Sequence, residues 1–320
     1  MKTQMISLAL LGALTSTMVT AAPSSQNEFG VDQVSPAQRY GRSTGSAGQV
    51  SITQSESTIT DKASKKSVEL DVQQTSVEAV GQYNLPYRIF AGLKVGLESQ
   101  STDTTTKRLT SNNSFRILKS DARADGYNLN PFVGVNITPN ITAAYELGYH
   151  KASDDDDSYD YMQQKVGVSY HKDIYELGAV YQSQVKQTEA NIASSVTLHG
   201  QAMVTDQLAV GGLIKRSLEN RLDDSRNDTH YVKLTSQYAL NDKWDLEGAV
   251  GFQPSSASDK DQVDVATAQS FDTQLGAYYQ VQKNLQLGSA VKYGTFKDET
   301  DANEVDAKAL AFSVKANYLF

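Results

Sequence analysis

The chain has 320 residues, a net charge of -8 and no cysteine, and 39% of its residues are hydrophobic. This acidic balance argues against a nucleic-acid partner, because phosphates are bound by clustered lysine and arginine. Without cysteine the chain has no disulfide framework, so its stability must come from an extended network of packing and backbone hydrogen bonds.

The first residues carry the features of an export signal. Lys2 supplies a positive charge, the stretch from Ile6 to Val19 is apolar, and small residues follow up to Ala21. Residues 1–21 are therefore predicted to be a signal peptide that is cleaved on export. Residues 22–47 are rich in Ser, Gly, Gln and Pro and are predicted to be a polar N-terminal extension. No later stretch is apolar for long enough to form a membrane-spanning helix.

From residue 48 to residue 320, apolar and polar residues alternate repeatedly with the period of a β-strand. In the segment 87–98, for example, Leu93, Val95 and Leu97 share one face, whereas Lys94 and Glu98 share the other. The same pattern recurs at residues 127–137 and 141–149. Each repeat predicts a strand with one apolar face and one polar face.

Short and long connections alternate between these segments. Short turns are predicted near residues 85–86, 138–140, 171–173, 205–207, 241–243 and 282–284. Longer hydrophilic connections are predicted near residues 99–125, 151–158, 185–191, 219–228, 253–267 and 297–306. This plan is typical of transmembrane β-barrels, with short periplasmic turns and long extracellular loops. The prediction is an all-β, closed antiparallel barrel over residues 48–320 with about fourteen strands of roughly ten residues. The polar stretch 51–67 obscures the first pair, near residues 50–58 and 68–85, so twelve strands is the alternative.

Aromatic residues at the predicted short-turn ends favour a membrane barrel over a soluble β-sandwich. Their amphipathic rings suit the headgroup layer of a bilayer, whereas a sandwich would place them in mid-strand. These residues are Tyr83, Tyr87, Tyr170, Tyr175, Tyr238, Trp244, Tyr279 and Tyr318.

The sequence ends on an alternating strand in which Leu310, Phe312, Val314, Ala316, Tyr318 and Phe320 share one face. A terminal Phe with an aromatic residue two positions before it resembles the C-terminal assembly signal of Gram-negative outer-membrane β-barrel proteins. That resemblance implies recognition of Tyr318 and Phe320 by the barrel-assembly machinery, and contact with outer-membrane lipid and lipopolysaccharide. The overall size and strand number are also similar to those of the fourteen-stranded OmpG-like porins, which implies a monomer.

If the apolar faces meet lipid, the polar faces line the interior. The candidate pore-lining residues are Arg88, Lys94, Glu98, Glu146, Glu176, Lys215, Lys233, Asp245, Glu247, Asp272, Lys292 and Lys315. Such a set cannot form a dry apolar core, because unpaired buried charges are costly. Lys165 falls on the same face, although a bulge nearby would reverse it. Glycines also favour this face, and we expect them to leave room for water.

The sequence therefore predicts a porin-like channel for passive diffusion of small hydrophilic solutes or ions, with no cofactor. A structural or adhesive barrel without an open pore is an alternative that conductance would distinguish. The acidic run from Asp154 to Asp157, on a predicted loop, is interpreted as a solvated charge run rather than a metal site.

A surface protease is a further alternative. The segment 225–231 resembles the Asp-x-His segment of the omptin proteases, and the resemblance implies that Asp228 and His230 would orient and deprotonate a water molecule. It also implies a second acidic pair set near tryptophans, whereas the single tryptophan, Trp244, lies beside a short turn at the other end. We therefore expect the protein not to be an enzyme.

Overall fold

The computed structural model describes residues 47–63, 66–109, 115–154, 158–172, 174–186, 194–220, 226–258, 264–299 and 303–319. The strands run Ala47–Ala63 (β1), Lys66–Asn84 (β2), Ile89–Leu109 (β3), Phe115–Thr138 (β4), Ile141–Asp154 (β5), Ser158–Lys172 (β6), Tyr175–Lys186 (β7), Ser194–Met203 (β8), Leu208–Asn220 (β9), Arg226–Asn241 (β10), Trp244–Ser258 (β11), Asp264–Gln282 (β12), Leu285–Glu299 (β13) and Asn303–Leu319 (β14). A short 3-10 turn, Pro86–Arg88 (η1), joins β2 to β3. The predicted signal peptide and the predicted extension, apart from Ala47, lie outside the described residues.

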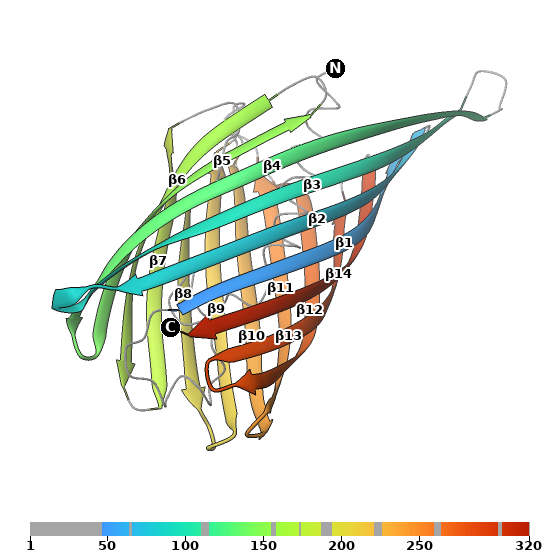
Figure 1. Ribbon diagram of the computed structural model, residues 1–320. Helices are drawn as coiled ribbons and strands as arrows, with labels where there is room; N and C mark the ends of the chain where they lie inside the picture. Colours follow the sequence, from blue (N-terminus) through green and yellow to red (C-terminus); the bar gives the residue numbers. More distant parts are fainter. Residues whose placement is uncertain are drawn as a thin grey trace.

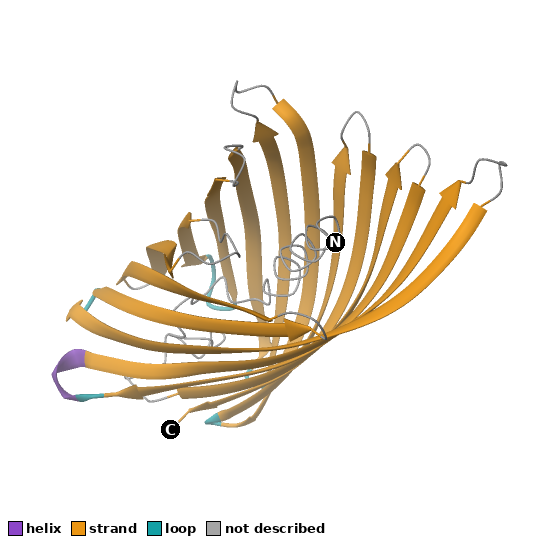
Figure 2. Cartoon of the chain, turned by 90° about the horizontal axis from the view of Figure 1, so that it is seen from above, coloured by secondary structure: helices purple, strands orange, loops and turns teal. Residues whose placement is uncertain are grey.

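Each strand pairs antiparallel with its neighbours in the chain, and β14 pairs with β1, so the sheet closes into a barrel (Figure 1). The predicted all-β closed barrel is confirmed, with fourteen strands. The closing seam extends from Ala47 opposite Leu319 to Ala63 opposite Asn303. Closure leaves no unpaired strand edge, which a lipid environment could not satisfy with hydrogen bonds. The helical colour in Figure 2 marks η1, and among the described residues no helix is long and apolar enough to cross a bilayer.

The two faces of the wall differ in polarity, as the alternating pattern predicts. Leu234 and Leu275 on the outer face are 64% and 72% exposed. Their neighbours Lys233 and Gln274 point to the opposite side and are buried. Because successive strand residues point to opposite faces, this alternation places apolar side chains outside and polar side chains inside along the barrel.

Except for β8, which has 10 residues, the strands are longer than the roughly ten residues expected for spanning a bilayer, and β4 reaches 24. The predicted long connection at residues 99–125 is wrong, because β3 continues to Leu109 and β4 begins at Phe115. In this region the outward residues Ser101 and Asp103 are polar, and so are the inward residues Thr102 and Thr104. The pattern that marks a strand vanishes where both faces are polar, although the backbone ladder continues. Figure 1 shows β3 and β4 extending well beyond most other strands at this end.

The opposite end of the barrel carries the predicted short turns, and we call it the periplasmic end because bacterial barrels place short turns there. Three of these turns are closed by a side chain. Thr138, Thr205 and Asn241 each accept two backbone N–H bonds from the residues two and three positions ahead, at 2.9–3.2 Å. This is the ordinary chemistry of Asx and Ser/Thr turns.

Aromatic rings cluster near the same end. The Trp244 and Tyr279 rings lie 4.9 Å apart between centroids, and the Tyr170 and Tyr175 rings lie 5.9 Å apart. Tyr318 is exposed on the outer face of β14, as the period of its strand predicts. Such rings are suited to a bilayer interface.

Candidate functional site: the inner wall of the barrel

The inner face of the barrel brings together all the predicted pore-lining residues except Arg88. The residues on this face are Lys94, Glu98, Glu146, Glu176, Lys215, Lys233, Asp245, Glu247, Asp272, Lys292 and Lys315, as the strand pairing and alternation place them. Arg88 instead lies in η1, where it is exposed and has a φ of 63°. The alternating pattern was extended too far toward the N-terminus, because β3 begins only at Ile89.

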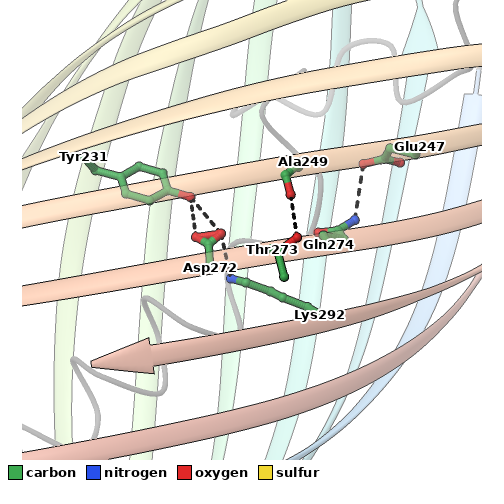
Figure 3. A network of polar contacts seen from close by, with 7 residues as sticks. All are labelled: Tyr231, Glu247, Ala249, Asp272, Thr273, Gln274 and Lys292. Carbon is green, nitrogen blue, oxygen red and sulfur yellow. Dashed lines mark hydrogen bonds and ion pairs between the residues drawn. The ribbon is translucent and has the colours of Figure 1, made fainter. Parts of the chain in front are cut away.

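Strands β10, β12 and β13 share a network of polar contacts on their inner faces (Figure 3). The Tyr231 hydroxyl donates to Asp272 Oδ1 at 2.8 Å, and Lys292 Nζ lies 4.0 Å from Asp272 Oδ2. Lys233, only 2% exposed, adds a positive charge that acts on both Asp272 and Glu247. Asp272 is therefore held by a phenol and by lysine charges.

The network continues toward the periplasmic end through two more carboxylates. Glu247 accepts hydrogen bonds from Tyr278 Oη at 2.8 Å and from Gln274 Nε2 at 3.2 Å. Asp245 accepts one from Gln286 Nε2 at 3.0 Å. Buried carboxylates are costly unless donors satisfy them, and each carboxylate of this wall has at least one donor. The result is a fixed array of charges on the inner face of β10–β14.

Inner-face glycines accommodate these side chains. A Cβ at Gly288 would collide with the ring of Tyr278, and a Cβ at Gly134 would collide with the ring of Phe90. The expectation that such glycines leave room for water is therefore wrong at these positions. The space is filled by rings from the neighbouring strands, which lie against the wall.

A second group of charges lies on β2–β6. Lys94 Nζ is 2.8 Å from Glu78 Oε2, and Lys165 Nζ is 3.4 Å from Glu146 Oε1. Lys165 thus lies on the inner face, as the unbroken alternation predicted. Its neighbour Gln164 points outward, where its amide donates to Ser183 Oγ at 3.1 Å. That bond reduces the cost of an amide on the outer face.

An imidazole extends this second group. The His150 ring stacks on Tyr161 at 4.5 Å with an interplanar angle of 10°, and its Nε2 lies 2.7 Å from Gln163 Nε2. These residues come from adjacent positions on the inner faces of β5 and β6. The wall here combines one imidazole, one phenol and two ion pairs.

The inner face also carries two apolar clusters. Val80, Phe90 and Phe132 pack together near the periplasmic end. Ile59, Val72 and Ala307 pack together in the opposite half of the barrel. The polar wall is therefore bounded by apolar patches on β1–β4 and β14.

Sequence reasoning missed several members of the polar network. Tyr231 and Tyr278 were not singled out, although both share strand parity with the inner residues Lys233 and Gly276. Counting only charged residues as pore candidates left out the phenols that satisfy the carboxylates. A search for tyrosines in phase with inner charges would have found them.

Other predicted residues lie elsewhere. His230 is exposed and pairs across strands with the exposed Arg216, on the outer face of β10. Asp228 lies on the same strand, two residues before it. Phe320 and the run 155–157 lie outside the described residues. Within the part of the chain that the structure describes, no cluster of His, Asp or Glu side chains is arranged to hold a metal ion.

Comparisons with known proteins agree with this architecture. Residues 34–171 match the family described as "Outer membrane protein beta-barrel domain". No curated protein matches the chain. The fold is similar to the Pseudomonas putida toluene transporter TodX, with a TM-score of 0.63 and 12% identity over 89% of this chain and 92% of that one.

Two further solved structures are similar. The Ralstonia pickettii toluene transporter TbuX has a TM-score of 0.59 and 12% identity, over 88% of this chain and 91% of that one. A Pseudomonas aeruginosa FadL homologue has a TM-score of 0.57 and 10% identity, over 86% of this chain and 90% of that one. At such identities the likeness shows the fold alone. The expected similarity to OmpG-like porins therefore holds for the closed fourteen-stranded barrel alone, because the three similar structures are toluene transporters and a FadL homologue. The closed fourteen-stranded architecture agrees with this partial family match, and residues 34–171 of the chain are thus similar to outer-membrane β-barrel domains.

Proposed function

We propose that this barrel is a passive channel for small hydrophilic solutes or ions across the outer membrane. The observation that carries the proposal is the inner wall, where carboxylates and lysines are held in place on both β2–β6 and β10–β14. Asp272 with Lys292, and Glu78 with Lys94, represent the two groups. Fixed charges on an inner wall favour a hydrated path, because an apolar solute would strip water from them without replacing it.

The balance of these charges favours cations. With Arg88 in a turn, the lysines on the inner face, among the residues whose side chains the structure describes, are Lys94, Lys165, Lys215, Lys233, Lys292 and Lys315. The carboxylates on the same face, among the residues whose side chains the structure describes, include Glu78, Glu98, Glu146, Glu176, Asp245, Glu247 and Asp272, and they outnumber the lysines. Carboxylates along a pore favour cations, and salt screens this preference over about 10 Å at 0.1 M.

A planar-bilayer recording of the purified protein tests the proposal. We expect stepwise conductance with a mild cation preference at low salt that fades as salt rises. A clear anion preference at low salt would contradict the charge assignment. A folded protein without conductance would favour the structural or adhesive barrel.

A second candidate is a channel for small apolar molecules. The two apolar clusters, around Phe132 and around Ile59, favour it because they offer an apolar inner surface. Liposome swelling with small sugars and uptake of labelled toluene by cells expressing the barrel separate the two candidates. Swelling without toluene uptake supports the hydrophilic channel, and the reverse result supports the apolar one.

We also propose that the protein has no protease activity. His230 points away from the inner face, next to the exposed Arg216, so it is not placed toward a cleft inside the barrel mouth. General acid–base catalysis requires the base to lie within hydrogen-bond reach of the reacting water and its substrate.

A further inference from the structure

The turn between β2 and β3 departs from the chemistry of the other short turns. Tyr87 and Arg88 both have positive φ, 64° and 63°, and no side chain caps the turn. Two consecutive left-handed residues are the geometry for which an Asn-Gly pair is favoured, because a Cβ in this conformation is strained. The three side-chain-closed turns described above avoid this strain.

The Leu85 N–H donates to the Ile89 carbonyl across this turn at 2.8 Å, but among the described residues no side-chain contact of Tyr87 or Arg88 offsets the strain. Tyr87 is 91% exposed, so its ring does not pack on the barrel. Among the described residues, no carboxylate forms an ion pair with Arg88. Strained residues cluster at binding sites, so the strain at Tyr87 and Arg88 indicates that these two side chains bind a ligand outside the barrel.

The surroundings of the turn indicate which ligand fits. Tyr83 and Leu85, four and two residues before Tyr87, are exposed as well, and so is Ile137 of the adjacent strand β4. The lipid-facing apolar surface thus continues to the turn itself. From Ala79 to Leu97 the chain has no acidic residue, in a protein whose net charge is -8. A tyrosine beside an arginine at the periplasmic edge of an apolar surface is suited to the phosphate-bearing headgroup layer of a bilayer.

We propose that the β2–β3 turn binds anionic phospholipid headgroups of the periplasmic leaflet. The Arg88 guanidinium contacts the phosphate, and the Tyr87 ring lies in the headgroup layer. This binding site is on the outside of the barrel and does not depend on the channel function. It anchors one point of the wall to the membrane.

A fluorescence experiment tests the position of the turn. Trp244→Phe removes the native tryptophan, and Tyr87→Trp then places a single reporter in the turn of the full chain. In vesicles that contain phosphatidylglycerol, we expect quenching by lipids brominated near the headgroup and protection from aqueous acrylamide. Matched reporters are Leu275→Trp on the outer face and Asp242→Trp in the exposed β10–β11 turn, both in the same background. A Tyr87→Trp reporter quenched by acrylamide as strongly as the Asp242→Trp reporter would overturn the proposal.

A double variant tests the role of the side chains. Tyr87→Asn with Arg88→Gly supplies residues that tolerate the turn geometry and removes both proposed lipid contacts. In phosphatidylcholine vesicles we expect its urea midpoint to equal or exceed that of the unchanged protein. Phosphatidylglycerol should shift the folding equilibrium of the unchanged protein by about fivefold, the size expected for one arginine near an anionic surface, and this shift should be lost in the variant. A variant that keeps the shift, or that is less stable in both lipids, contradicts the proposal.

Discussion

Replacing Gly288 by Ala should destabilise the barrel by removing the space that the Tyr278 ring occupies. A Cβ at this position would collide with ring atoms of Tyr278, whose hydroxyl donates to Glu247 at 2.8 Å. The ring must therefore either strain the wall or move away and leave Glu247 with one donor fewer. Overpacking costs about 1–3 kcal/mol, and loss of a hydrogen bond to a buried carboxylate costs about 1–3 kcal/mol. We expect the free energy of unfolding to fall by about 1–3 kcal/mol, whichever of the two the ring does.

Urea titration of the protein folded in phospholipid vesicles, followed by the heat-modifiable band shift, measures this loss. Gly81→Ala is the matched control, because Gly81 lies on the outer face of β2 and has nothing within 4 Å of the added Cβ. We expect that control to change the free energy of unfolding by less than about 0.5 kcal/mol.

A double-mutant cycle assigns the effect to the ring. In a Tyr278→Ala background, Gly288→Ala has no ring to displace and should cost much less than in the unchanged protein. The reasoning that a glycine is needed at position 288 to accommodate the Tyr278 ring would be refuted by either of two results. One is that Gly288→Ala lowers the free energy of unfolding equally in the two backgrounds, and the other is that it lowers it no more than Gly81→Ala does.

Three further predictions concern the pore, assembly and catalysis. Glu78→Gln should weaken the cation preference, and Lys94→Met should strengthen it. The double variant should give a reversal potential close to the original, because the two charges lie 2.8 Å apart and are neutral overall. Identical shifts of the reversal potential in both single variants would contradict this prediction. Deleting Phe320 should reduce the folded, heat-modifiable band in outer-membrane fractions, and assembly at the original yield and rate would argue against the C-terminal signal. The folded protein should not cleave basic peptides, and hydrolysis that is abolished by Asp228→Ala and by His230→Ala would reverse the ranking of functions.

Much of the fold follows from local pattern. The alternation that places Lys233 and Leu234 on opposite faces is a property of any extended strand, so the lipid-facing and inward residues were predictable one by one. The prediction failed where the pattern lost its contrast. Residues 99–108 are polar on both faces, and nothing local distinguishes such a strand from a hydrophilic loop.

Arg88 shows a different limit. Its parity matches that of Lys94, but a turn with positive φ intervenes before β3 begins, and neither Tyr87 nor Arg88 is a residue that predicts such a turn. Turn residues usually reveal left-handed geometry through glycine or asparagine. Without them, extending the alternation of β3 toward the N-terminus gives the wrong direction for the Arg88 side chain.

The barrel architecture, the even number of strands and the face of nearly every charged residue were predictable from local pattern, because strand periodicity and turn spacing repeat along the chain. Which charged and polar side chains meet depends on the closed sheet. Tyr231 and Asp272 are brought together from β10 and β12, with β11 between them, and Glu247 meets Tyr278 across adjacent strands. These contacts depend on the register of each strand pair, which turn geometry and the apolar faces of both neighbouring strands set together and which no single segment encodes.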